Sequence, residues 1–443
     1  MAADRAIDAK EEKRRIWAWQ LYDWADSAFA TIVLTGCLPL YFSKVCTAGL
    51  PQHSASLATS LWGATAAISM ALVAVAALLL GPIADATARK KRCLGWFLAL
   101  GAASTAALAF CPPRLWWMIS ILFILGNLGF CGGNIFYDSL LPAVAGRDKL
   151  DRVSSGGYAL GYLGGGLLLA VCLGVMLVLP MQRVEGGGWF PVVGMRLSFL
   201  STAAWWALFS LPLFGRVPEP AMGVEGSAMT IRIALGRLAQ TARNIRAHSE
   251  MVKFLIAFWL YSDGFGTIIK MAVIYAGEIF AKRRQDPTAH LIGTVLLVQF
   301  VGIPCTLFWG RVARRFGAKS AVMACLFVYM LICIFGYFMD AIWHFYVLGL
   351  AVAFVQGGSQ ALSRSLFAVL VPQGKEAEFF GFYNISGKFA GVIGPAMMSI
   401  IAVATGTSRP AILALIVFFV LGGALLAAVR FDGQTNSHER RMS

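Results

Sequence analysis

Long apolar stretches separated by short polar segments make up most of the chain. A helix that crosses the hydrocarbon core of a membrane needs about 20 predominantly apolar residues. Twelve stretches approach or exceed that length, at 18–43, 57–84, 93–112, 115–140, 155–180, 194–214, 253–280, 289–310, 320–339, 343–370, 379–403 and 409–430. The pattern therefore predicts an all-α integral membrane protein with twelve transmembrane helices.

The longest polar segment separates the first six predicted spans from the last six. The sequence predicts a cytoplasmic N-terminus at 1–16, a six-helix bundle at 17–214, a cytoplasmic linker at 215–252, a second six-helix bundle at 253–430 and a cytoplasmic tail at 431–443. Apolar residues of the linker fall on one helical face, at Ile231, Leu235, Leu238, Ala242 and Ile245. This pattern favours a helix that lies at the inner membrane surface and tethers the halves, with a regulatory or lipid-sensing element as the alternative.

Four short strings recur in the same order in the two halves of the chain. The pairs are FATI with FGTI, GPIADATARKKR with GRVARRFGAK, YDSLLP with FAVLVP, and GGYALGYLGGG with FFGFYNISGKFAG. FATI begins at Phe29 and FGTI at Phe265, and the other pairs are separated by a similar length of chain. The recurrence predicts two pseudo-symmetric bundles, a layout in which transporters place the substrate site between the halves near the bilayer midplane.

Composition narrows the class of protein. Residues of the set AVILMFWYC make up 58% of the chain, and charged residues only 13%, whereas a soluble domain has about 25% charged residues. A soluble enzyme and a disordered chain are therefore both excluded. The nine Cys lie mostly within apolar stretches without a CxxC, and the five His are scattered, so we expect no metal, no cofactor and no enzymatic activity.

The net charge of +15 has a topological explanation. If the N-terminus lies inside, the inner segments carry 26 Lys and Arg residues and the outer segments carry 8. Basic residues collect in cytoplasmic loops of membrane proteins. We therefore expect both termini in the cytoplasm, a bacterial inner (plasma) membrane as the location, and no nucleic-acid partner.

The segment after the second predicted span carries the first recognisable motif. Its sequence GPIADATARKKR resembles the G-x-L-A-D-x-x-G-R-K loop of the major facilitator superfamily, with matches at Gly81, Ala84, Asp85, Arg89 and Lys90. Longer strings resemble the vacuole-effluxer-like branch of that superfamily: YDWADSAFATIV, NIFYDSLLPAV, GGYALGYLGGGLLL, LYSDGFGTI, GGSQALSRSLFA and EAEFFGFYNISGKFAGVIGP. The resemblance implies the twelve-helix major facilitator fold, and yeast members of the branch export amino acids from the vacuole.

In the superfamily, helices 1, 4, 7 and 10 line the central cavity. The polar residues of the predicted spans concentrate on these helices and on helix 11. The resemblance therefore implies a substrate and proton cavity that includes Asp23, Asp26, Asn127, Asn134, Tyr137, Asp263, Lys270, Gln356, Gln360 and Lys388. For the Asn and Gln residues, hydrogen bonding between helices is the alternative.

Two aspartates lie on one face of the first predicted span. An ionisable group in a membrane span costs about 3 kcal/mol or more, so it usually has a function. Asp23 and Asp26 are one turn apart, and two neighbouring carboxyls favour binding of a proton by one of them. We interpret them as a proton-coupling site, although both could instead accept hydrogen bonds, or Asp23 could face the basic residues at 14–15. In the resembling family Asn usually stands at the position of Asp26.

The repeat also relates helix 1 to helix 7. Asp26 precedes FATI by three residues, and Asp263 precedes FGTI by two. We therefore expect the two carboxyls at similar depth on opposite sides of the cavity. Lys270 follows Asp263 by two helical turns, so this pair is predicted to orient the cargo while Asp26 takes the proton.

Residues near the cytoplasmic ends of the helices are predicted to act as gates. Asp138 and Arg364 end helices 4 and 10, and we expect them to make and break ion pairs as the halves rock. Asp85 resembles the facilitator aspartate that meets the N-terminal end of helix 11, where free amides favour an anion. Gly81, Arg89 and Lys90 complete this predicted gate motif.

These features together predict a secondary active transporter that moves a small polar or zwitterionic, amino-acid-like solute by alternating access, coupled to protons. We expect a monomer. A transporter of lipids or amphiphiles is one alternative, since the chain holds 31 Phe and 13 Trp. The other is a non-transporting membrane receptor or assembly factor, but no polar stretch is long enough to form a sensory domain.

Overall fold

The computed structural model describes residues 2–42, 45, 55–87, 89–112, 114–184, 188–219, 249–281, 288–372, 374–389, 393–405, 407 and 409–431. Within these segments, the description of side chains leaves out 2–9, 55–60, 78–87, 188, 270–281, 288–292, 385, 388, 389, 399, 402 and 403. The predicted linker helix, the basic residues at 282–284 and the tail from 432 onward lie outside the described residues.

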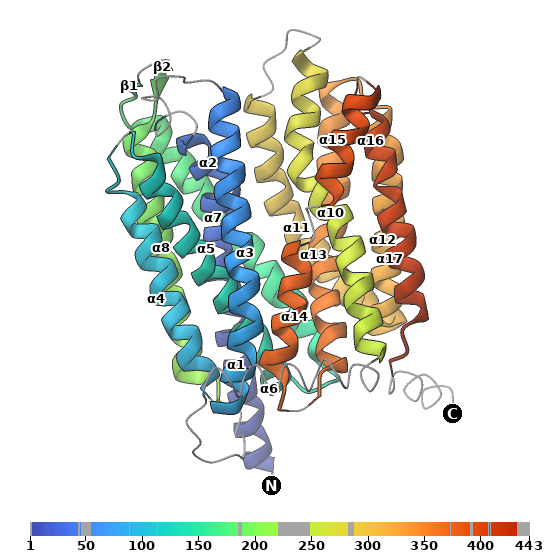
Figure 1. Ribbon diagram of the computed structural model, residues 1–443. Coiled ribbons are helices and arrows are strands. Elements are labelled where there is room, and N and C mark those ends of the chain that lie inside the picture. The colour runs from blue at the N-terminus through green and yellow to red at the C-terminus, as the bar shows by residue number, and fades with distance from the viewer. Residues whose placement is uncertain are drawn as a thin grey trace. The chain divides into compact units, whose positions relative to one another are not determined.

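The chain divides into two compact units, Met1–Val144 with Leu160–Ala234 and Ala145–Ala159 with Leu235–Ser443. The first unit contains most of the helices before the linker (Figure 1). They are α1 (Ala2–Ala28), the π-helix η1 (Phe29–Gly36), α2 (Cys37–Tyr41), α3 (Ala55–Thr87), α4 (Lys90–Leu108), α5 (Trp116–Ser139), α6 (Leu141–Val144), most of α7 (Leu150–Val178) and α8 (Val192–Arg216). Strands β1 (Gln182–Val184) and β2 (Gly188–Phe190) pair as a short antiparallel hairpin between α7 and α8.

The second unit contains the helices after the linker together with the first turns of α7. They are α10 (Ser249–Ala281), α11 (Thr288–Phe316), α12 (Ala318–Tyr337), α13 (Ile342–Leu370), α14 (Glu376–Phe389), α15 (Ile393–Thr405), α16 (Arg409–Ala414) and α17 (Ile416–Ala428). Every predicted span coincides with one of these helices or with consecutive helices. Among the described residues, eight helices are long and apolar enough to cross a membrane.

Aromatic rings fill the interior of each unit. In the first unit, Phe29 lies 5.2 Å from Phe130 and 5.3 Å from Trp206, measured between ring centroids. In the second unit, Tyr329 stacks on Phe419 at 5.2 Å. Burial of large rings contributes strongly to the stability of a core and fixes how neighbouring helices face one another.

Large apolar side chains also cover the outside of both units. Described examples on different helices are Val75, Trp96, Leu177, Phe327 and Ile400, each more than half exposed. A soluble protein does not expose so many large apolar groups. In a bilayer these side chains contact lipid tails, which agrees with the apolar composition of the chain.

A lysine near the start of one helix caps the end of another in both units. The Lys91 ammonium donates to the carbonyl oxygens of Phe214 and Val217, at 2.8 and 2.7 Å, where α8 ends. In the second unit, Lys319 donates to the carbonyl oxygens of Ala427 and Val429 where α17 ends. Each lysine lies at the C-terminal end of the repeated string after the second span of its half, Lys91 within GPIADATARKKR and Lys319 as the last residue of GRVARRFGAK, so the shared contact supports the internal repeat.

Close packing of α4 on α5 depends on a glycine of α5. A methyl group added to Gly129 would lie 2.5 Å from backbone atoms of Gly101 and 2.7 Å from the carbonyl oxygen of Phe97. Because backbone atoms cannot turn aside, Gly129→Ala must separate the two helices. Overpacking of this kind costs about 1–3 kcal/mol, so we expect a clear fall in the melting temperature of the purified protein.

The matched control is Gly174→Ala on α7, where an added methyl group meets nothing within 4 Å. Its melting temperature should not fall below that of the wild type, because alanine favours a helix over glycine by about 1 kcal/mol. Equal melting temperatures for both variants would contradict the tight α4–α5 contact.

Candidate functional site

Three carboxyl groups gather around one tyrosine in the first unit. Asp23 and Asp26 on α1 and Asp138 on α5 are buried, with exposed fractions of 8%, 5% and 6%. All three act electrostatically on the hydroxyl group of the fully buried Tyr22. This hydroxyl lies above Gly133 of α5, where an added methyl group would be 2.9 Å from it.

Stacked rings hold this cluster in place. Tyr137 of α5 lies between two rings of α1, with centroids 4.5 Å from Trp19 and 4.6 Å from Tyr22. The indole nitrogen of Trp19 donates to the carbonyl oxygen of Tyr137 at 3.1 Å. The facing surfaces of α1 and α5 are thereby fixed, and the carboxyls of both helices are held near the same hydroxyl.

The arrangement combines buried carboxyl groups with a buried hydroxyl group. An ionisable group inside a membrane span is costly, so buried carboxyls of this kind usually have a function. A tyrosine hydroxyl can both donate and accept a hydrogen bond. The cluster therefore places carboxyl groups near a hydroxyl that can exchange hydrogen bonds with neighbouring polar groups.

The two asparagines of α5 differ in their surroundings. The amide of Asn127 donates to the Ser69 hydroxyl of α3 at 2.8 Å, and its oxygen accepts from Cys131. This is the helix-packing alternative raised above. The side-chain oxygen of Asn134 is buried and has no hydrogen-bond partner among the described residues, so Asn134 remains the stronger candidate for contact with a solute.

The most buried acid described in the second unit is Asp263 on α10, which is 1% exposed. The backbone amide of Gly394, in the first turn of α15, donates to both of its carboxylate oxygens at 3.2 Å. Amides of a first helical turn lack partners within the helix and favour a negative charge. A methyl group on Gly394 would lie 3.1 Å from the carboxylate and collide with Thr267, so only glycine allows this approach.

A similar contact in the first unit identifies the repeat equivalent of Asp263. Gly165 of α7 approaches the Thr31 hydroxyl and the backbone carbonyl oxygen of Ser27, and Gly394 approaches the Thr267 hydroxyl and the Asp263 carboxylate. Alignment of FATI with FGTI places Ser27 opposite Asp263, because each residue precedes its string by two positions. Asp26 is therefore one residue, or about 100° around a helix, from the repeat equivalent of Asp263, and the similar depth of the two carboxyls stays a prediction.

Polar residues form a stripe along α13. Gln356, Gln360 and Arg364 follow at intervals of four residues and so share one face of the helix. The side-chain oxygen of Gln356 is buried and has no hydrogen-bond partner among the described residues. Gln360 is half-buried.

Arg364 connects α13 to the beginning of α7. It is 2% exposed, and its guanidinium donates to the hydroxyl and the carbonyl oxygen of Ser154 at 2.9 and 3.1 Å. The Tyr158 ring lies 4.4 Å from the guanidinium carbon. One residue along α13, the Ser365 hydroxyl donates to the Asp151 carboxylate at 2.5 Å. These contacts join the first turns of α7 to α13.

The remaining predicted site residues are only partly placed. The side chains of Asp85, Lys270 and Lys388 and the surroundings of Gly81 lie outside the described part of the structure. Arg89 is exposed just before α4. Lys90 is 1% exposed, and its neighbour Lys91 reaches α8 instead.

Sequence reasoning missed several residues that the structure brings to these positions. Ser154 and Tyr158 surround Arg364, and Lys91 and Lys319 join helix ends. A signal for Ser154 was present, because two hydroxyls interrupt an otherwise apolar and glycine-rich helix in RVSSGGY.

Comparison with known proteins agrees with this architecture. The profile of the vacuole effluxer Atg22-like family matches residues 11–438. The chain is 36% identical to the uncharacterized MFS-type transporter YxiO of Bacillus subtilis (strain 168), over 96% of each chain. It is 30% identical to autophagy-related protein 22-1 of Aspergillus niger over 63% of its own length, and the match spans 47% of that longer fungal protein.

Solved transporter structures share the fold at low sequence identity. The human organic anion transporter MFSD10 (TETRAN) superposes with a TM-score of 0.72 at 17% identity, covering 94% of this chain and 99% of the other. The proton:xylose symporter XylE superposes with a TM-score of 0.68 at 15% identity, covering 95% and 96%. Both have the twelve-helix major facilitator fold, which confirms the predicted fold class. The chain therefore belongs to the vacuole effluxer Atg22-like family and is a multi-pass membrane transporter of the major facilitator type.

Proposed function

We propose that the protein is a proton-coupled secondary transporter of a small zwitterionic, amino-acid-like solute, working by alternating access. The observation that carries the proposal is the cluster of Asp23, Asp26 and Asp138 around the Tyr22 hydroxyl. Carboxyls are costly inside a membrane protein and are retained mainly where they serve transport or coupling. Binding and release of a proton in this cluster gives the first unit two electrostatic states.

A zwitterion suits the charges of the second unit. Asp263 offers a carboxylate to an ammonium group, and the predicted partner Lys270 offers a cation to a carboxylate. Hydrogen bonds to charged groups contribute about 1.5–3 kcal/mol each, so two such contacts select a molecule with both charges over a neutral sugar or an apolar compound. The half-buried Gln356 and Gln360 add neutral donors and acceptors on α13.

Alternating access requires contacts that form in one state and break in the other. We assign this role to Arg364 and its contacts with Ser154 and Tyr158, together with the short bond from Ser365 to Asp151. Several polar and aromatic groups thus meet at the first turns of α7. Asp85 and Asp138 remain the proposed acidic partners in gating.

Ligand-dependent unfolding of the purified protein tests the proposed cargo. A ligand at about 100 times its dissociation constant stabilises the native state by about 2.7 kcal/mol. We expect amino acids to raise the melting temperature, and neutral sugars of similar size to leave it unchanged. Stabilisation by amphiphiles alone, without any response to amino acids, would contradict the proposed cargo and favour a lipid transporter.

A further inference from the structure

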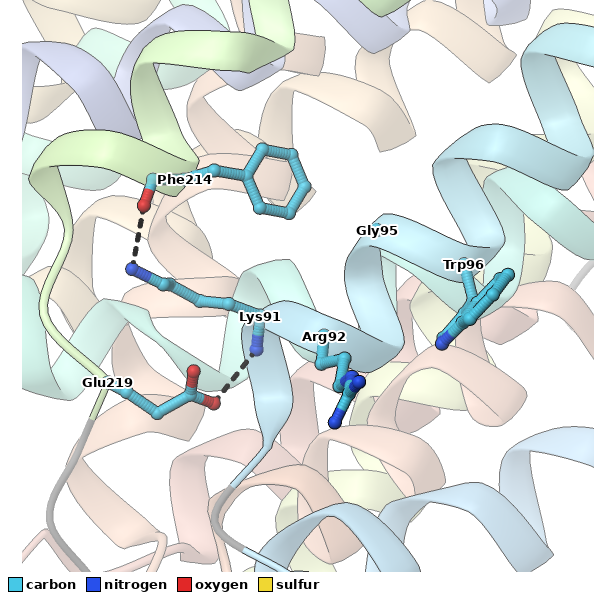
Figure 2. A pocket seen from close by; sticks show the side chains of 6 residues that line it. All are labelled: Lys91, Arg92, Gly95, Trp96, Phe214 and Glu219. Carbon is cyan, nitrogen blue, oxygen red and sulfur yellow. Dashed lines mark hydrogen bonds between the residues drawn. The ribbon is translucent and has the colours of Figure 1, made fainter.

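An open cavity of about 430 Å³ lies where α4 begins and α8 ends. It is lined by Lys91, Arg92, Gly95, Trp96, Phe214 and Glu219 (Figure 2). Two of its charges are already engaged in joining the helices. The Lys91 ammonium donates to the carbonyl oxygens at the end of α8, and its backbone amide donates to the Glu219 carboxylate at 2.9 Å.

The other polar groups of the cavity face outward. Arg92 is exposed and forms no hydrogen bond or ion pair within the described part of the protein, and Trp96 is 72% exposed. Both project from α4 in Figure 2, about one helical turn apart. Between them, Gly95 leaves room, since an added methyl group would only touch the Phe214 ring at 3.4 Å.

The second unit joins its helix ends with different neighbouring residues. Lys319 makes the same contacts there. When Lys91 is aligned with Lys319, the positions of Arg92, Gly95 and Trp96 correspond to Ser320, Met323 and Ala324. The Met323 side chain lies against α17, within 3.8 Å of a methyl group added to Gly423. The arginine, the open glycine and the tryptophan are therefore special to the first unit.

The cavity lies at the strongly basic end of its unit. Arg89, Lys90, Lys91 and Arg92 follow one another, and Arg216 ends α8. The proposed orientation places this end at the cytoplasmic leaflet, which is rich in anionic lipids. Trp96 lies about 6 Å further along the helix than Arg92, and Trp is enriched at the headgroup level of membranes.

We propose that this cavity binds the phosphate headgroup of one anionic phospholipid. The Arg92 guanidinium pairs with the phosphate, because its planar donors match phosphate oxygens. The Trp96 ring lies along the upper acyl chains, and its indole N–H reaches the ester region. The bound headgroup then rests against the junction of α4 and α8 and stabilises it.

Lipid binding to the purified, delipidated protein tests this site. Native mass spectrometry follows the first bound molecule during titration with dioleoyl phosphatidylglycerol or dioleoyl phosphatidylcholine. We expect the wild type to prefer phosphatidylglycerol. Arg92→Gln should reduce that affinity about fivefold, the contribution of one basic residue near anionic lipid.

Two leucine variants separate the cavity from general surface charge. Gly95→Leu fills the cavity without changing charge and should abolish the preference. Gly174→Leu places the same side chain on an open surface of α7 and should bind like the wild type. Unchanged phosphatidylglycerol binding by Gly95→Leu would overturn the proposal.

A soluble competitor identifies the source of the phosphate. Millimolar inorganic phosphate should not displace the bound lipid, because the acyl chains contribute to its affinity. Displacement by inorganic phosphate, together with equal binding of the two lipids, would show a site for free phosphate and overturn the lipid assignment.

Discussion

Replacing Asp263 by asparagine is expected to weaken binding of the cargo at least about tenfold at every pH. Asparagine keeps an oxygen that can accept from the Gly394 amide, so α15 stays in place. The negative charge offered to the ammonium group of the cargo is lost. Hydrogen bonds to charged groups contribute about 1.5–3 kcal/mol, and tenfold in affinity is about 1.4 kcal/mol. Calorimetric titration of the purified variant measures the effect.

Two further variants separate cargo binding from support of α15. Asp263→Ala removes the acceptor for Gly394 as well as the charge, so it should also lower the melting temperature. Ser27→Ala changes the repeat-equivalent position and should leave affinity unchanged. If Asp263→Asn bound the cargo like the wild type while Asp263→Ala unfolded, Asp263 would be a purely structural cap.

Arg364→Lys is expected to reduce transport about 100-fold or more while the protein remains folded. Lysine keeps the positive charge but lacks the planar fork that donates to both oxygens of Ser154, and it cannot stack on Tyr158 in the same way. Loss of two charge-assisted bonds at about 1.5–3 kcal/mol each shifts a two-state equilibrium strongly toward the state that lacks them. Initial rates of uptake into proteoliposomes measure the loss.

The matched control is Arg152→Lys, an exposed arginine in the first turns of α7, which Arg364 of α13 contacts. It should transport like the wild type. Near-normal rates for Arg364→Lys would show that positive charge alone is sufficient at this position, and the proposed gate contact with Ser154 would be wrong.

The fold could be predicted from the sequence because each helix that crosses a membrane needs an apolar stretch of about 20 residues. Each of the twelve predicted stretches coincides with one helix or consecutive helices, and the short repeated strings correspond to recurring contacts such as those of Lys91 and Lys319. The length of the apolar stretch at 18–43 did not reveal the π-helix at Phe29–Gly36. The hydropathy of a residue does not show whether its amide donates to the carbonyl oxygen four residues earlier, as in an α-helix, or five residues earlier, as in a π-helix.

The sites were harder to predict because they depend on side-chain direction. Sequence spacing placed Asp23 and Asp26 together, but only the packing of α1 on α5 brings Asp138 to the same tyrosine. The motif directed attention to Lys90, whereas the adjacent Lys91 points to α8. One residue is about 100° of helix, so a motif identifies a turn more readily than a side chain.

The central claim is that Asp26 carries the coupled proton. The most direct measurement uses an amino acid that raises the melting temperature of the protein. Its uptake into proteoliposomes is measured with and without an imposed proton gradient, for the wild type and Asp26→Asn. Asparagine is the residue usual at this position in the family, so the variant should fold and bind. We expect the gradient to drive accumulation by the wild type but not by Asp26→Asn, which should only equilibrate the solute. Gradient-driven accumulation by Asp26→Asn equal to that of the wild type would contradict the account and place the coupling site elsewhere.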